Sequence, residues 1–343
     1  MPRGLIQGAV FCCNNSDYNS GLPGYTKKYA GRGLLTSISY HHYSIGGCDG
    51  KSAALWKLMS NDPFVLTAAY MQPFVTAAQE AGIFFRIGEG NTVSCGGAPG
   101  VSDVFAAALF SLDVMMETSA IGINQWNCEC FCLLATFLIC PHRTQAAAFP
   151  RPAHHTLPHT STHTHTHTHT PAGHGGPGAH YTPISFAKPP APPGPPDVRP
   201  LFYGLWAFTE ATAGNSSIVK STVQSSNELI KLWALCEGGC SAASGDQRVF
   251  RVLAIFKDYN QTSNATISVA PPSGLSPQPG TLVRLMAPGI TASTGVSWGG
   301  QTFDGSASGL PLGSRVTEAV PVSGTGFSFT LPPASAALLT FTA

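Results

Sequence analysis

Apolar residues along the first 127 positions follow two alternating patterns, short continuous runs and longer runs with helical spacing. Residues 64–82 predict a helix that Pro73 interrupts, and residues 104–116 predict a second helix with one apolar stripe and Ser102 as its N-cap. The short runs predict strands and read LIQGAVFC, LLTSISYHHYS, IFFRIGE and IGINQWN. Strands alternating with helices indicate βα units around a parallel sheet, in a barrel or an open fold.

The pattern changes near the middle of the chain. The proline-rich run of residues 187–200 predicts an extended segment, and a proline-led helix follows it at residues 198–212. Beyond residue 215, short runs rich in β-branched and aromatic residues alternate with Gly, Pro, Ser and Asn clusters. This second pattern is typical of an all-β sandwich.

Residues 128–173 fit neither pattern. A short apolar, cysteine-rich run leads into a tract in which Thr and His alternate, and ten of the twelve histidines lie between His142 and His180. Alternating histidines favour a metal-binding interpretation, because they line one face of an extended chain. A dinucleotide repeat of the form ACACAC also encodes Thr-His repeats. We therefore interpret residues 128–173 as a translated intron and expect a disordered, low-complexity insert.

Composition excludes several classes of partner and location. Only 10% of the 343 residues are charged and the net charge is +1, so we expect no nucleic-acid partner. The chain has no apolar run of 18 residues and no secretory signal at its start. Cys236 and Cys240 are spaced for a small disulfide loop, which is typical of secreted proteins. Acceptor motifs for N-glycosylation point the same way and begin at Asn14, Asn215, Asn260 and Asn264.

Glu89 is the first candidate for chemistry. It follows a predicted strand and stands between Gly88 and Gly90, which leave its surroundings open to a ligand. In barrels of βα units the carboxyl ends of the strands hold the active site. The alternative is a turn with a solvated carboxylate.

A second polar cluster ends the preceding predicted strand. His41, His42 and Tyr43 follow one another there. Because side chains alternate along a strand, at most one of the two histidines reaches a site that Tyr43 also approaches. The alternative is that these residues pack and only their polar tips reach water.

Five segments together resemble glycoside hydrolase family 79, the β-glucuronidases and heparanases. They read SYHHYS, GIFFRIGEGNTVSCGG, GVSDVFAAALFSLDVMMETSAIGINQWN, HGGPGAHYTPI and VRPLFYGLWAF, and the resemblance continues through GVSWGGQTFDGSASG and LPPASAALLTF. When Asn127 is joined to His174, the sequence looks like the continuous segment of that family. This match supports the intron interpretation independently of the repeat.

The resemblance implies a (β/α)8 TIM barrel followed by a β-sandwich. Residues 1–127 and 174–214 correspond to the C-terminal half of the barrel, from about strand five, and residues 215–343 to the sandwich. It also implies a retaining glycosidase that removes a β-linked glucuronate or related sugar from a glycan, with no cofactor and no metal. The intact family member is expected to be secreted or in the cell wall.

The resemblance also implies roles for individual residues. Glu89 looks like the nucleophile. His42 and Tyr43 match residues that orient the nucleophile or contact the sugar. The remaining residues match the sugar-binding loops and are Asn91, Gly96, Gly97, Gly178 and Tyr181.

Two departures from the family pattern change the expected activity. The heparanase branch has a Tyr five residues after its nucleophile to bind the sugar carboxylate, and this chain has Ser94. The acid/base glutamate follows an Asn in the family, yet the sole Asn-Glu pair here is Asn227-Glu228, in the predicted sandwich. We therefore expect an inactive, aggregation-prone half-barrel. The alternatives are a glycan-binding or partner-binding remnant carried by the sandwich, and a metal-binding protein.

Overall fold

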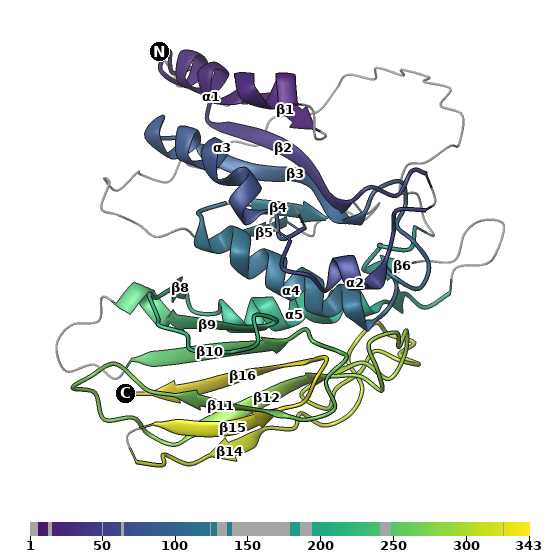
Figure 1. Ribbon diagram of the computed structural model, residues 1–343, viewed down its shortest axis with the longest axis vertical. Helices are drawn as coiled ribbons and strands as arrows, with labels where there is room; N and C mark the ends of the chain where they lie inside the picture. Colours follow the sequence, from purple (N-terminus) through teal and green to yellow (C-terminus); the bar gives the residue numbers. More distant parts are fainter. Residues whose placement is uncertain are drawn as a thin grey trace.

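Two β layers with helices between them make up the molecule (Figure 1). The computed structural model describes residues 6–12, 16–49, 51–62, 65–123, 125–128, 136–138, 179–185, 194–240, 248–324 and 326–343. A five-stranded sheet forms one layer and a β-sandwich the other, and helices α4 (Phe105–Ala120) and α5 (Pro200–Ala211) lie between them.

The first layer is a mostly parallel sheet in the order β1-β2-β3-β4-β5. The first four strands run parallel, as predicted, and are β1 (Gln7–Cys12), β2 (Ser37–Ile45), β3 (Phe84–Val93) and β4 (Gln125–Cys128). The last strand, β5 (Thr136–Leu138), pairs antiparallel with β4. The described residues form an open sheet and no closed barrel, so the α/β part of the expected fold is confirmed and the half-barrel remains a prediction.

Two of the three other helices of this layer were not predicted. They are α1 (Ser16–Ala30) and α2 (Leu55–Leu58), whereas α3 (Ala68–Glu80) was expected and contains Pro73. Ser102 is not the N-cap of α4, because that position belongs to Val104. The Ser102 hydroxyl instead accepts hydrogen bonds from Ala98 N at 3.0 Å and Thr92 Oγ1 at 2.8 Å.

Helix α4 is buried on nearly every side, and not along one stripe as its sequence predicts. Of its 16 residues, 13 are buried. The sheet covers one side of the helix, while α5 and the sandwich cover the other (Figure 1). Gly204 lets α5 approach closely, since a Cβ there would lie 2.2 Å from the Ala108 carbonyl oxygen. The sandwich and the parallel sheet therefore share one continuous hydrophobic core.

The second layer confirms the predicted β-sandwich. Its larger sheet has the order β13-β12-β16-β10-β9-β8 with β14 beside β12, and the smaller sheet pairs β11 with β15. Buried side chains of both sheets, such as Phe256, Ile267 and Phe329, form a separate core between them. The strands are β8 (Ser217–Ile218), β9 (Ile230–Cys236), β10 (Val249–Phe256), β11 (Ala265–Val269), β12 (Gly280–Met286), β13 (Ser297–Trp298), β14 (Glu318–Val320), β15 (Phe327–Leu331) and β16 (Ser335–Thr342).

The segments between the two layers are described only in part. The proline-rich run ends in β7 (Asp197–Val198), which pairs with β6 (Ile184–Ser185). Of the predicted insert, the structure describes Cys128 and Thr136–Leu138, and the rest, with the Thr-His tract, lies outside the described residues. The domain boundaries and the intron interpretation therefore stay predictions. Cys236 is disulfide-bonded, and its predicted pairing with Cys240 stays open.

Candidate active site

Glu89 lies within β3, four residues before the strand ends at Val93. Its carboxylate has one partner on each oxygen. Tyr43 Oη donates a hydrogen bond to Oε1 at 2.8 Å, and His41 Nδ1 lies 3.3 Å from Oε2. The side chains of Glu89 and His41 are 33% and 29% exposed, so a ligand in solution can reach the carboxylate.

A local irregularity of β3 points Glu89 toward these partners. Tyr40 pairs with Ile87, but His41 pairs with Glu89, so Gly88 is the extra residue of a β-bulge. Such bulges turn a side chain away from its regular direction and are common beside active sites. The bulge therefore sets the direction in which the Glu89 carboxylate points.

Both glycines beside Glu89 are required by packing, and they do not open space for a ligand as the sequence suggests. A Cβ on Gly88 would lie 2.1 Å from Ser39 Oγ. A Cβ on Gly90 would lie 2.7 Å from the His42 carbonyl oxygen and 3.0 Å from Trp126. Substituting either glycine would push apart the strands that hold the carboxylate.

The histidine beside Glu89 is His41, and this corrects the sequence-based role of His42. Side chains alternate along β2, so His41 and Tyr43 share one face and His42 lies on the other. The His42 side chain is 3% exposed, and its ring centroid lies 5.8 Å from that of Tyr70. We therefore expect His42 to pack against α3, on the face of β2 opposite Glu89.

Asn91 and Tyr181 join β3 to the loop before β6. Asn91 Nδ2 donates to the Tyr181 carbonyl oxygen at 3.2 Å, and Asn91 Oδ1 accepts from Thr92 N at 2.8 Å. The Asn91 side chain is 3% exposed, so it positions this loop and does not face solvent. Tyr181 is 1% exposed, with its ring centroid 6.1 Å from that of Tyr43. Gly178 lies outside the described residues.

Gly96 and Gly97 follow β3 and lie beside the same loop. Their φ angles are 93° and 81°, which a residue with a side chain rarely adopts. His180 N donates to the Gly96 carbonyl oxygen at 2.7 Å, and a Cβ on Gly97 would lie 2.8 Å from Tyr181 N. The structure thus brings Gly96, Gly97 and Tyr181 together, and their expected contact with sugar stays a prediction.

The sequence did not predict two contacts that hold the loop after β3 and the loop that contains Tyr181. Cys48 and Cys95 form a disulfide that joins the segment after β2 to the segment after β3. His180 Nδ1 lies 2.8 Å from Asp103 Oδ2, which ties the Tyr181 loop to the start of α4. The position of Cys95 in VSCGG was a signal for the first contact, but its partner could not be chosen among ten cysteines.

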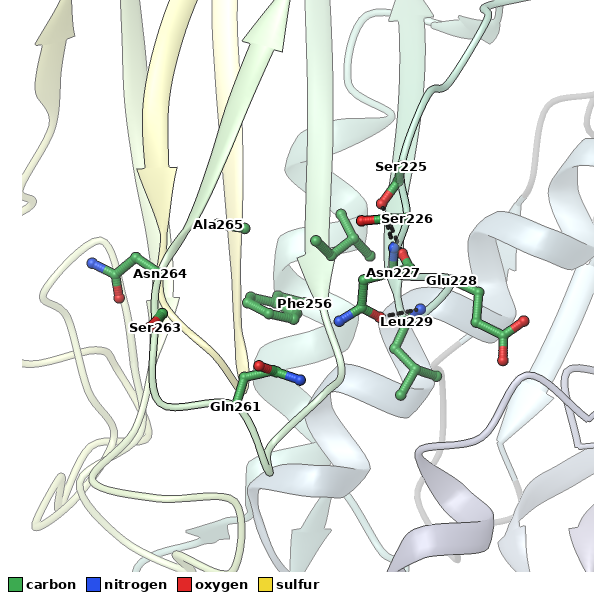
Figure 2. A pocket seen from close by; sticks show the side chains of 11 residues that line it. Ser225, Ser226, Asn227, Glu228, Leu229, Phe256, Gln261, Ser263, Asn264 and Ala265 are labelled. Carbon is green, nitrogen blue, oxygen red and sulfur yellow. Dashed lines mark hydrogen bonds between the residues drawn. The ribbon is translucent and has the colours of Figure 1, made fainter.

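A cavity of about 760 Å³ lies in the sandwich layer, and its lining includes no residue of β2 or β3 (Figure 2). Asn227 and Glu228 line it together with Gln261 and Asn264, over a floor that includes Phe256. Asn227 Nδ2 donates to Asp258 Oδ2 at 3.0 Å. The sole Asn-Glu pair of the sequence thus belongs to a surface of the sandwich.

Metal ligands and the surroundings of the Glu89 carboxylate can both be compared among the described residues. No three His, Cys, Asp or Glu side chains of the described ranges are grouped so that they could hold a metal ion. A carboxylate that accepts a hydrogen bond from a tyrosine hydroxyl and keeps access to solvent can attack an electrophilic carbon. Among the helices that the structure describes, none has the length and apolarity needed to cross a bilayer.

Solved glycoside hydrolases share this combination of a sheet layer and a β-sandwich. A 4-O-α-L-rhamnosyl-β-D-glucuronidase from Fusarium oxysporum 12S, in complex with Rha-GlcA, aligns with 98% of this chain and 59% of its own at 19% identity, with a TM-score of 0.65. An arabinofuranosidase aligns with 97% of this chain and 57% of its own at 13% identity and a TM-score of 0.55. At these identities the likeness shows the fold alone, and this chain spans about 59% of the length of the Fusarium protein.

One family model matches the chain, and the match lies in the sandwich. Residues 242–338 match the family model described as the glycosyl hydrolase family 79 C-terminal beta domain. The sandwich therefore matches the C-terminal domain of glycoside hydrolase family 79, which confirms the resemblance found in the sequence. No curated protein is similar enough to the chain to be matched.

Proposed function

We propose that this chain carries the nucleophile of a retaining glycosidase that acts on β-linked glucuronate or a related sugar. The observation that carries the proposal is the contact of both Glu89 oxygens with Tyr43 and His41, on a sheet that packs against a family 79 C-terminal domain. The reaction class follows from a partly exposed carboxylate that is held in one orientation on the central strand of the sheet.

In the proposed first step the Glu89 carboxylate attacks the anomeric carbon of the sugar. A bond forms between a Glu89 oxygen and C1, the bond from C1 to the leaving oxygen breaks, and the leaving group departs with the electron pair. The Tyr43 hydroxyl and the His41 imidazole hold the carboxylate in position. Water then cleaves the glycosyl ester and releases the sugar.

The proton donor of this reaction is proposed to come from outside the described residues. Retention needs a second carboxyl group about 5 Å from the nucleophile. Asn227 and Glu228 are poor candidates, because they lie on a cavity of the sandwich and Asn227 is hydrogen-bonded to Asp258. We therefore expect this chain alone to leave unactivated glycosides intact, since loss of an acid/base group costs on the order of 10²- to 10⁴-fold in rate.

The proposed sugar-binding groups are the glycine-rich loop after β3 and the loop that contains Tyr181. Backbone N–H groups of Gly96 and Gly97 are suited to a sugar carboxylate, because such turns form concave sites for anions. The proposed partner is a carbohydrate, and no cofactor enters the reaction. We propose an extracellular location, in line with the disulfide between Cys48 and Cys95.

A glycoside whose leaving group needs no proton tests the proposal. With 2,4-dinitrophenyl β-D-glucuronide, the chain should release up to one equivalent of dinitrophenolate in a burst and then slow down, because the glycosyl-enzyme forms without an acid. An alkyl β-glucuronide should release nothing. The proposal fails if the activated substrate gives no burst above the rate in buffer.

A second candidate function is glycan binding by the sandwich. The cavity of about 760 Å³ favours it, because seven of its eleven lining residues carry a hydroxyl, amide or carboxylate group (Figure 2). Calorimetry with oligosaccharides would separate the two functions. Binding lost in Gln261→Ala but kept in Glu89→Gln would favour the sandwich, and the opposite result would favour the sheet.

A further inference from the structure

The Cys48–Cys95 disulfide and Ser94 join the segments that follow β2 and β3. The two cysteines are 47 positions apart in the sequence, and their Cα atoms lie 5.2 Å apart. Cys48 directly follows Gly47 near the end of β2, and Cys95 directly precedes Gly96. The bond therefore connects the strand that supplies Tyr43 to the loop that supplies Gly96 and Gly97.

Ser94 uses its hydroxyl in this connection. Ser94 Oγ accepts a hydrogen bond from Gly47 N at 2.9 Å and lies 3.6 Å from Cys48 Sγ. A disulfide sulfur carries no proton, so the Ser94 hydroxyl is the donor in the second contact. The Ser94 hydroxyl therefore uses its proton and one of its lone pairs within the loop. The heparanase branch of the family has a Tyr at this position, which binds the sugar carboxylate.

The loop adopts a conformation that needs such support. Cys95, Gly96 and Gly97 have successive φ angles of 60°, 93° and 81°. A positive φ is unfavourable for cysteine because its Cβ is crowded, and it persists where surrounding structure holds it. The disulfide and the hydrogen bond from Ser94 N to the Ile45 carbonyl oxygen, at 2.9 Å, supply that support.

We propose that the Cys48–Cys95 disulfide and Ser94 are positioning residues for the carboxylate of the sugar. They fix the backbone of Gly96 and Gly97, which the proposed function places against that carboxylate. Recognition of the uronate then depends on the N–H groups of Gly96 and Gly97, which the Cys48–Cys95 disulfide holds in position. This inference rests on the proposed function and adds how its specificity is set.

The test compares a sugar analogue that has a carboxylate with one that lacks it. A glucuronate-configured and a glucose-configured iminosugar are titrated into the chain and into a Cys48→Ser/Cys95→Ser variant by calorimetry. We expect the chain to prefer the glucuronate-configured compound by about 10-fold or more, as a charge-assisted contact allows, and the variant to lose that preference. Affinity for the glucose-configured compound should stay within about 3-fold.

Two further variants separate positioning from a general loss of structure. Gly47→Ala leaves the cysteines in place, but its Cβ would lie 2.3 Å from Val93 Cγ1 and 2.8 Å from the Ser94 carbonyl oxygen. It should also lower the preference for the carboxylate. Cys236→Ser removes the disulfide of a cysteine on β9 and should leave the preference unchanged. Parallel loss of both affinities in the double variant, or an unchanged preference, would overturn the inference.

Amide hydrogen exchange gives a result that does not depend on ligand binding. In the double variant the Ser94 amide should exchange about 10-fold faster or more, while amides of β10 keep their rates. Unchanged exchange at Ser94 overturns the inference. If the chain binds neither iminosugar, the proposed function fails, and exchange alone decides whether the disulfide holds the loop.

Discussion

Two carboxylates of this molecule, one in the sheet layer and one between the layers, have opposite surroundings. Glu89 is one-third exposed. Its carboxylate contacts the Tyr43 hydroxyl and the His41 imidazole. Asp113 on α4 is fully buried, and its Oδ2 lies 2.6 Å from Lys257 Nζ, which is also fully buried. Lys257 Nζ also donates to the Ser60 carbonyl oxygen at 2.9 Å.

The difference separates a carboxylate that a ligand can reach from one that holds two parts of the fold together. Taking a charge out of water is costly, so the buried pair persists because each ion neutralises the other. Asp113, Lys257 and Ser60 join α4 to the segment that directly follows β10 and to the segment after α2. Glu89 keeps access to solvent and can meet a substrate. Of these two carboxylates, only Glu89 is therefore open to a ligand in solution.

Loss of the Glu89 charge should have the largest effect on chemistry. In Glu89→Gln the burst with 2,4-dinitrophenyl β-glucuronide should fall by about 10³-fold or more, because an amide is a poor nucleophile. Urea unfolding should show a change below about 1 kcal/mol, since the side chain is partly exposed. Stopped-flow absorbance measures the burst, and a burst of unchanged size would remove Glu89 from the nucleophile role.

Loss of one partner of the buried pair should have the largest effect on stability. Asp113→Asn or Lys257→Met leaves the other charge buried without its counter-ion and should lower the free energy of unfolding by about 3–5 kcal/mol. Asp113→Leu/Lys257→Met together should cost less than either single change. Urea unfolding of the four proteins tests this, and additive losses in the double variant would contradict a coupled pair.

A smaller effect is expected at Tyr43. Tyr43→Phe removes the hydrogen bond to Glu89 Oε1, and a hydrogen bond to a charged group contributes about 1.5–3 kcal/mol. The burst should therefore slow by about 10- to 100-fold. Thr76→Val changes a hydroxyl on α3 that contacts Gln72 and serves as the control. Equal burst rates in Tyr43→Phe and the chain would show that this contact does not orient the nucleophile.

The smallest expected effect is a dependence of one turn on pH. The Ser52 hydroxyl, followed by the N–H groups of Lys51 and Ser52, lowers the pKa of Asp49 from 3.8 to about 2. A lowered pKa stabilises the folded turn above pH 3.8, and this stabilisation is lost as the pH falls through about 2. An NMR titration of the Asp49 carboxyl group measures the pKa directly. A midpoint near 3.8 would contradict the turn geometry, and Asp49→Asn should remove the pH dependence.

Much of the fold could be predicted from hydrophobic patterns. All four parallel strands, α3, α4, α5 and the sandwich were expected. Ser102 was assigned wrongly, because its hydroxyl bonds to Thr92 and Ala98 and these contacts arise only when the loop folds. α4 shows the other limit, since its buried Asp113 pairs with Lys257, a residue 144 positions away that directly follows β10. Long-range partners of this kind leave no local pattern.

The candidate site was predicted in part. Glu89 and Tyr43 meet as expected, yet the histidine beside them is His41. Strand alternation places His41 on the face of Tyr43, whereas the resemblance pointed to His42, and the bulge at Gly88 brings Glu89 opposite His41. A bulge shifts the register by one residue, and the sequence gives no sign of that shift. The disulfide between Cys48 and Cys95 could not be chosen for the same reason, because its geometry depends on the register of β2 and β3.

The most direct test of Glu89 as nucleophile is covalent trapping with 2-deoxy-2-fluoro-β-D-glucuronyl fluoride. Fluoride leaves without a proton donor, so the reaction needs only the nucleophile. Peptide mass spectrometry should find one fluoroglycosyl group on Glu89, and the adduct should be absent in Glu89→Gln and present in the matched control Glu228→Gln. An adduct that persists in Glu89→Gln, or no adduct on the chain, would contradict the account.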